Sequence, residues 1–171
     1  MGSALDEVFK PATIAIVTVS DTRALETDRS GTFLSESLSE AGHKLAQRKI
    51  VKDDVLSISQ TLTMLLSNFE LDSIILTGGT GLSARDVTLE ALNPFFEKPI
   101  PGFGELFRML SYEEIGPAAI QSRAEAGLIG NCVVFALPGS TGACRLALQR
   151  IILPQLDNTH KPCNFRTVIR S

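Results

Sequence analysis

Short apolar runs bounded by turn residues alternate along this chain with longer segments of helical period. Four such runs predict strands: TIAIVTVS (13–20), KLAQRKIV (44–51), SIILTG (73–78) and NCVVFALPGS (131–140). Strands that alternate with helices are typical of a parallel sheet covered on both faces. We therefore predict an α/β fold, a three-layer α/β/α sandwich around a mostly parallel sheet, with the second run nearer an edge.

The segments between these runs predict helices from their apolar spacing and their capping residues. Ser30 is expected to cap the first helix and Gly42 to end it, and Asp53 or Asp54 to cap the second, which runs to Phe69. The later helices are expected at VTLEALNPFF (87–96), at 104–127 with a break near Gly116, and at TGACRLALQRIILPQL (141–156).

Length and composition favour one domain. With 171 residues and 44% hydrophobic content, the chain can build one well-formed core and is short for two. We expect a single domain over residues 1–171, with terminal arms at 1–12 and 157–171. The second arm carries Lys161, Arg166 and Arg170, and we expect it to be a solvated or subunit-contacting end.

Charge, cysteine and histidine usage exclude several classes of protein. A net charge of −3 gives no basic field for nucleic acid or anionic lipid. No apolar run is long enough to span a bilayer and the start lacks a secretory leader pattern, so we expect a cytoplasmic protein. The three cysteines have no CxxC spacing, and His43 and His160 are not spaced as metal ligands, so neither a disulfide framework nor structural zinc is predicted. Both histidines are expected at the surface.

Three turns that follow predicted strands carry the functional signal. The first lies in LTGGTGLSARDVTL (76–89), the second spans residues 138–142, and the third is SDTR (20–23). In open α/β sheets, ligands bind beyond the carboxyl ends of the strands, where backbone N–H groups attract anions. The three turns therefore favour a phosphorylated ligand, although glycine after a strand is also an ordinary turn residue.

Other phosphate motifs do not fit. Residues 79–84 match GxGxxA, but no second strand follows with an acid for a ribose, and no GxxxxGK[ST] motif is present. Asp86 near the next helix can be a dipole-favoured acid or, beside a phosphate cradle, a Mg²⁺ ligand. Asp53 and Asp54 can likewise be a helix cap or a metal and substrate ligand. The chain shows no Ser-His-Asp or Cys-His arrangement, so any phosphoryl chemistry depends on positioning and charge.

Four segments, in order, resemble a known family. TGGTGLSARDVTLEAL, PGFGELFRMLSYEEIG, QSRAEAG and LPGSTGACR are similar to the molybdenum-cofactor biosynthesis proteins of the MoaB/MogA type, and TVSDTR, IVKDD and the ending PQLDNTHKPCNF are closer to the MoaB branch. The resemblance implies a three-layer α/β/α domain and trimers, or hexamers of paired trimers. It also implies adenylylation of molybdopterin with Mg-ATP, which yields adenylyl-molybdopterin and pyrophosphate before a partner protein inserts molybdate.

The resemblance also implies roles for individual residues. Asp53 and Asp86 match the two family acids, implicated in catalysis and in placing Mg²⁺. Mg²⁺ is the implied cofactor, whereas ATP and molybdopterin are substrates. The residues expected to bind substrate or its phosphates are Ser20, Thr77, Gly78, Gly79, Thr80, Gly81, Gly102, Gly104, Glu105, Ser122, Arg123, Pro138, Gly139 and Ser140.

Three functions stay open on these residues. The first is a molybdopterin adenylyltransferase, and the second is a carrier that holds molybdopterin or a nucleotide without turnover. The third is an oligomeric scaffold, because residues 101–116 carry more apolar side chains than one short helix needs for a core contact. We expect this segment to pack between subunits.

Overall fold

One sheet organises the molecule. A computed structural model describes residues 8–169, and six strands of this part of the chain pair in the order β2-β1-β3-β6-β5-β4. Their bounds are β1 (Thr13–Val19), β2 (Lys44–Val51), β3 (Ser73–Thr77), β4 (Lys98–Pro99), β5 (Glu125–Ile129) and β6 (Cys132–Leu137). The first four strands of that order pair in parallel, β5 pairs antiparallel with β6, and β4 pairs antiparallel with β5. The predicted α/β class, the mostly parallel sheet and the edge position of β2 are confirmed.

The antiparallel edge was not predicted, since residues 104–127 were expected to be helical. Residues 125–129 instead pair with β6 through a tight turn in which Gly130 has φ +56°. The ring of Phe96 lies against Gly127 so closely that a Cβ there would be 2.4 Å from it. A small residue packed under an aromatic ring gives no strand signal in sequence, and the two residues of β4 are too few to show a period.

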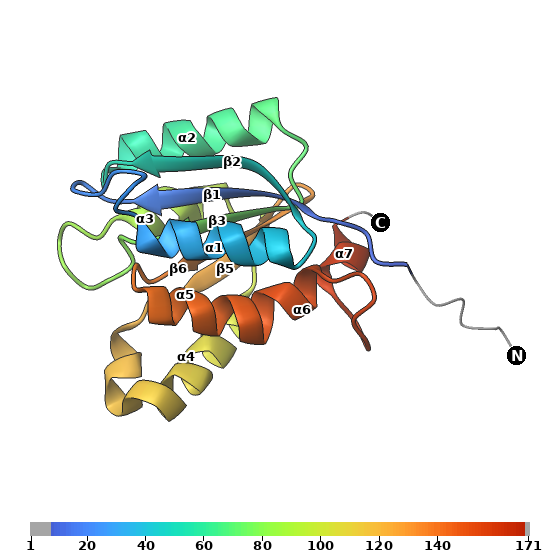
Figure 1. Ribbon diagram of the computed structural model, residues 1–171. Coiled ribbons are helices and arrows are strands. Elements are labelled where there is room, and N and C mark those ends of the chain that lie inside the picture. Colours follow the sequence, from blue (N-terminus) through green and yellow to red (C-terminus); the bar gives the residue numbers. More distant parts are fainter. Residues whose placement is uncertain (1–7, 170–171) are drawn as a thin grey trace, which may run out of the picture.

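The helices cover both faces of the sheet (Figure 1). Figure 1 shows α2 on one side and α1, α4 and α5 on the other. The bounds are α1 (Arg29–Glu40), α2 (Val55–Asn68), α3 (Thr88–Leu92), α4 (Pro101–Ile115), α5 (Thr141–Ala147), α6 (Leu153–Leu156) and α7 (Phe165–Val168). Short 3-10 turns span Asn93–Phe95 and Gly116–Gln121, and a π turn at Leu148–Ile152 joins α5 to α6.

Alternate strand residues supply the two cores, as the period of a pleated strand requires. Ile14 and Ile16 of β1 pack in the core under α1, α4 and α5, whereas Ala15, Val17 and Val19 pack in the core under α2 and α3. In the first core the rings of Phe103 in α4 and Phe135 in β6 meet edge to face, with centroids 5.1 Å apart. Both faces of the central strands β1, β3 and β6 are therefore buried, and α4 packs against β6.

Asp28, and not Ser30 as expected, caps α1. One Asp28 carboxylate oxygen accepts the Gly31 backbone N–H at 3.0 Å, and the other accepts the Thr18 hydroxyl at 2.7 Å and the Arg48 guanidinium at 3.1 Å. Burial opposes ionisation of this carboxyl, but these hydrogen bonds outweigh burial and hold its pKa below the ordinary value. The partners from β1 and β2 favour Asp28, and sequence does not reveal them.

The first described residues lie beside the segment that follows α6, at the end of the molecule away from the glycine turns. The Asn158 side chain accepts the Lys10 backbone N–H at 2.6 Å and donates to the Val8 carbonyl oxygen at 3.0 Å. Arg166, expected at a solvated or subunit-contacting end, is instead 5% exposed and forms an ion pair of 2.5 Å with the buried Asp72. Arg170 lies outside the described residues.

His43 is buried, contrary to expectation, and His160 is exposed as expected. The Nδ1 atom of His43 accepts the Ala12 backbone N–H at 3.0 Å. Burial, aided by the charge of Arg166, lowers the pKa of this imidazole. His43 is therefore a structural acceptor at the start of β1.

Across residues 8–169, no helix combines the length and the apolarity that a membrane crossing requires.

Candidate functional site

A cleft of about 530 Å³ lies at the carboxyl ends of β1, β3 and β6. Figure 1 shows the loops that follow these strands gathered at one end of the molecule, on the left. The cleft is lined by Val19, Ser20, Thr22, Arg23, Gly78, Gly79, Thr80, Gly81, Asp86, Phe107, Ser111, Ile115, Gln121, Ser122, Pro138, Gly139, Ser140 and Ala143. All three turns expected from the sequence thus converge on one hollow.

The first turn follows β3 in a backbone conformation that requires glycine. Gly78 has φ +103°, and a Cβ there would lie 2.3 Å from the Val19 carbonyl oxygen. Gly79 has φ +63°. Thr88 at the start of α3 holds the turn, because its hydroxyl donates to the Gly78 oxygen at 2.8 Å and its N–H to the Gly79 oxygen at 3.0 Å. These bonds keep the backbone of the turn packed against the end of β1.

The second turn follows β6 and touches the first. A Cβ on Gly139 would be 3.3 Å from the Gly78 Cα, so the two turns lie in contact. The Thr77 hydroxyl donates to the Pro138 oxygen at 3.0 Å. Ser140 caps α5, since its hydroxyl accepts the Ala143 N–H at 3.2 Å. Thr77 therefore supports the second turn through this hydrogen bond and does not itself line the cleft.

The two predicted acids lie against the first turn. A Cβ on Gly79 would be 2.7 Å from Asp53 Oδ1, and one on Gly81 would be 2.8 Å from Asp86 Oδ2. Asp53 accepts the Val87 N–H at 3.3 Å, and Asp86 accepts the Ser83 N–H at 3.0 Å. The helix cap that either Asp53 or Asp54 could supply comes from Asp54, which accepts the Ser57 N–H at 2.8 Å.

Asp53 is the acid whose ionisation is disfavoured. Burial raises the pKa of its carboxyl, and although the Val87 hydrogen bond opposes this shift, the nearby charges of Asp86 and Asp21 add to it. A raised pKa caused by burial and by neighbouring carboxylates is typical of a site that takes up a cation. Asp53 therefore meets the electrostatic expectation for a functional acid.

Asp53 and Asp86 are the carboxylates that the sequence predicted to hold Mg²⁺. Within residues 8–169, no cluster of three or more His, Cys, Asp or Glu side chains could hold a metal without other ligands. Mg²⁺ is commonly bound by one or two carboxylates together with substrate phosphates and water. Asp53 and Asp86 beside the glycine turn provide such a donor set, so the residues fit a cation that arrives with a phosphate.

Arg123 supports the first turn and does not line the cleft. Its Nε donates to the Gly81 backbone carbonyl oxygen at 2.9 Å, and one Nη donates to the Asp86 backbone carbonyl oxygen at 3.0 Å. The other Nη binds Glu90 at 2.6 Å. Arg123 thus fixes the backbone that carries Asp86, while its neighbour Ser122 lines the cleft.

The two glycines of the PGFGE segment, Gly102 and Gly104, do not line the cleft. Gly104 and Glu105 line a separate cavity of about 440 Å³ between α4 and β5, and Gly102 lines neither cavity. A Cβ on Gly104 would be 2.5 Å from the Ala124 oxygen. Gly104 therefore permits close packing of α4 on the sheet, and the single chain does not bring it to the glycine turns.

Several cleft residues were not predicted. Phe107, Ser111 and Ile115 of α4 form a wall of the cleft, and only the packing of α4 could place them there. Asp21 was also missed although SDTR had been singled out. It does not line the cleft, but its carboxylate accepts the Asp53 N–H at 3.1 Å and pairs with Arg85 at 2.7 Å. Arg23 of the same motif lines the cleft.

Comparison with known proteins finds a matching family and similar proteins of the same pathway. The family described as "Probable molybdopterin binding domain" matches residues 15–158. Molybdenum cofactor biosynthesis protein B of Escherichia coli strain K12 is 47% identical over 157 residues, which cover 92% of each chain.

Solved structures of relatives have the same fold. A crystal structure of molybdenum cofactor biosynthesis protein B superimposes with a TM-score of 0.85 at 51% identity, covering 88% of this chain and 94% of that one. The molybdopterin biosynthesis enzyme MoaB of Thermus thermophilus gives a TM-score of 0.74 at 30% identity, covering 88% and 98%. The chain therefore belongs to the molybdenum cofactor biosynthesis protein B (MoaB) family, the branch that TVSDTR, IVKDD and the ending PQLDNTHKPCNF indicated.

Proposed function

We propose that this protein is a molybdopterin adenylyltransferase, which joins molybdopterin to the AMP portion of Mg-ATP and releases pyrophosphate. The observation that carries the proposal is that Asp53 and Asp86 both lie against the glycine turn that lines the cleft, where Asp86 is itself a lining residue and Asp53 is not. A Thermus relative is described as a molybdopterin biosynthesis enzyme, and the family resemblance implies this reaction.

The proposed chemistry needs alignment more than a protein nucleophile. The terminal phosphate of molybdopterin attacks the α-phosphorus of ATP, the bond to the β-phosphate oxygen breaks, and pyrophosphate leaves. The two glycine turns orient the phosphates, while Asp53 and Asp86 hold Mg²⁺. Bound there, Mg²⁺ supplies the positive charge that disperses the negative charge of the transition state.

Pyrophosphate release tests the proposal. The wild type is incubated with molybdopterin, ATP and Mg²⁺ beside Asp53→Asn and Asp86→Asn, and we expect each variant to lose about 100-fold or more in rate, the order found when a charge-stabilising group is removed. Asp54→Asn is the matched control, because its carboxylate caps α2 and asparagine caps equally well. Turnover by Asp86→Asn at the wild-type rate would refute the assignment, and saturable binding without any turnover would assign the cleft to a carrier.

We propose further that the protein is a homo-oligomer, a trimer or a hexamer. Large apolar side chains on α4 and the following 3-10 turn are exposed: Leu106, Met109, Tyr112, Ile115 and Ile120. An apolar face of this size on one element is typical of a subunit contact. Because Ile115 also lines the cleft, such a contact would border the site.

Sedimentation tests the oligomer. Leu106→Glu is expected to lower the sedimentation coefficient toward that of the monomer, whereas Leu56→Glu, at an exposed apolar position on α2, should not. An unchanged coefficient in Leu106→Glu would remove α4 from the interface. Transfer of the product to a molybdate-insertion protein and a cytoplasmic location stay predictions of the family resemblance.

A further inference from the structure

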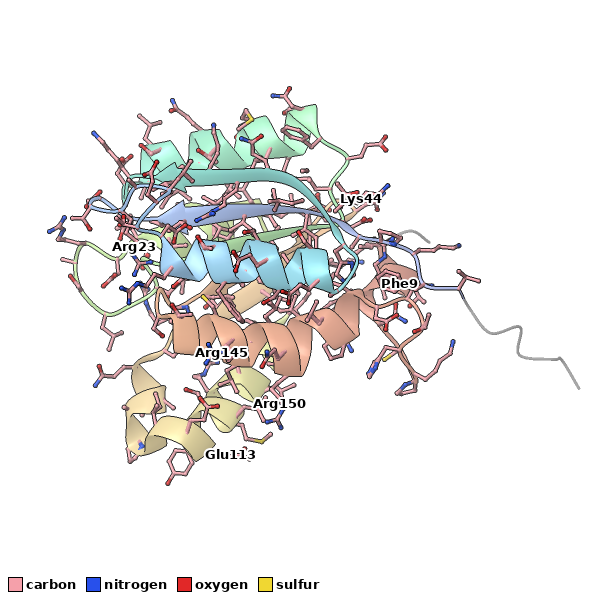
Figure 2. The ribbon with its side chains drawn as sticks, viewed as in Figure 1. Phe9, Arg23, Lys44, Glu113, Arg145 and Arg150 are labelled. Atoms are coloured by element: carbon pink, nitrogen blue, oxygen red, sulfur yellow. The ribbon has the colours of Figure 1, made fainter. Side chains whose placement is uncertain are left out.

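Arg23 is distinguished by its charge among the residues of the cleft. Of the described residues that line it, Arg23 and Asp86 alone carry a formal charge, and Arg23 is the basic one. Figure 2 shows Arg23 at the end of the molecule where the strand-end loops gather, opposite Phe9 and Lys44. A cleft that takes a polyphosphate therefore offers one cationic side chain of its own.

The loop after β1 directs this side chain to the second glycine turn. The Ser20 hydroxyl accepts the Arg23 backbone N–H at 3.1 Å, which tightens the loop. Both Nη atoms of Arg23 lie 3.3 Å from the Gly139 carbonyl oxygen, and one lies 3.8 Å from the Asp28 carboxylate. The side chain thus reaches from the loop after β1 to the turn after β6, although β3 lies between these two strands in the sheet, and it is 36% exposed.

Neither neighbour depends on Arg23. The Gly139 oxygen already accepts a shorter bond, of 2.8 Å, from the Ser30 hydroxyl. Asp28 is already paired with Arg48 at 3.1 Å. A guanidinium has five N–H donors in a planar fork that matches a phosphate, and the two long bonds to Gly139 engage only part of them. A purely structural role, in which Arg23 only links the loop after β1 to Gly139 and Asp28, therefore explains its position poorly.

We propose that Arg23 binds a phosphoryl group of the substrate at the second glycine turn. The inference rests on the proposed function, since it places a phosphorylated substrate in the cleft. The carboxylates of Asp53 and Asp86 lie against the first glycine turn, and the Arg23 guanidinium lies against the second, so positive charge is available to the ligand at both turns once Mg²⁺ is bound. The phosphoryl group belongs either to ATP or to molybdopterin, and the two share the same recognition chemistry.

Calorimetric titration of the full chain separates charge from hydrogen bonding at this position. Arg23→Gln keeps amide donors for the Gly139 oxygen but removes the charge, and Arg23→Lys keeps the charge. Arg29→Gln is the matched control, an exposed arginine that does not line the cleft. The probes are Mg-ATP, molybdopterin and inorganic pyrophosphate, each titrated at low and at high salt.

For the ligand whose phosphoryl group Arg23 holds, we expect Arg23→Gln to raise Kd by about 10- to 100-fold, the range for a charged hydrogen bond, and to flatten the salt dependence. Arg23→Lys should retain most of the affinity. The ligand that loses affinity, Mg-ATP or molybdopterin, identifies the source of the phosphoryl group.

Two results would overturn the inference alone, and a third would also overturn the proposed function. Equal affinities of Arg23→Gln and Arg29→Gln for all three probes would remove Arg23 from the site. Equal losses in Arg23→Gln and Arg23→Lys with unchanged salt dependence would make it a structural tie. Absence of binding by the wild type would instead refute the proposed function, and the inference with it.

Discussion

Replacement of Gly78 by alanine tests the packing that forms the candidate site. The new Cβ would lie 2.3 Å from the Val19 carbonyl oxygen, a backbone atom of the central sheet, whereas ordinary contact begins near 3.4 Å. The turn or the end of β1 must therefore move by about 1 Å. The φ of +103° adds backbone strain for any residue with a side chain.

The two costs set the magnitude. A side chain at positive φ costs about 1–3 kcal/mol, and an overpacked contact in a rigid environment costs about 1–3 kcal/mol more. Gly78→Ala should therefore destabilise the fold by about 2–6 kcal/mol. At about 2–4 °C per kcal/mol for a domain of this size, the Tm falls by about 4–24 °C.

Gly142→Ala is the matched control on the neighbouring turn. A Cβ there meets no atom within 4 Å, and Gly142 lies inside α5. Alanine in a helix is favoured over glycine by about 0.5–1 kcal/mol, so this variant should be slightly more stable than the wild type. Thermal unfolding followed by circular dichroism at one protein concentration compares the two. If Gly78→Ala unfolds at the same temperature as Gly142→Ala, the argument from the Val19 contact is wrong.

Three further predictions follow from buried groups. Because burial and the charge of Asp86 raise the folded-state pKa of Asp53 above its unfolded value, stability falls as pH rises through that range. Asp53→Asn should therefore raise the Tm at pH 7, with a gain that disappears in acid below the ordinary aspartate pKa. A thiol reagent at pH 8 should label Cys163 rapidly, whereas the two buried cysteines, whose pKa values burial raises to about 11 and about 12, should react only on unfolding; fast labelling of all three would contradict their burial. Arg166→Leu should lower the unfolding free energy by about 3–5 kcal/mol in denaturant titrations because it removes the buried ion pair between Arg166 and Asp72, and a loss below about 1 kcal/mol would show that water replaces the guanidinium.

Local pattern was sufficient for the parallel half of the sheet and for the glycine turns. The runs of β1, β2, β3 and β6 are long, apolar and bounded by turn residues, so their period and their ends are visible without any tertiary information. The same holds for the first glycine turn, because φ values of +103° and +63° are open to glycine and to few other residues.

Partners distant in sequence decided the rest. The carboxylate of Asp28 caps α1 because Thr18 and Arg48 reach it from two strands. Arg123, which lies 42 positions beyond Gly81 in the sequence, donates to the Gly81 oxygen and so holds the first turn. His43 is buried because Ala12 and Phe9 lie against it.

The sequence by itself determined which residue types meet at the strand ends, since a parallel sheet brings the carboxyl ends of its strands to one edge whatever the helices do. Tertiary structure alone decided which of those residues face the cleft. The contact between the two glycine turns, the wall from α4 and the reach of Arg23 to Gly139 depend on side chains from separate elements, and no period or spacing along the chain encodes their distances.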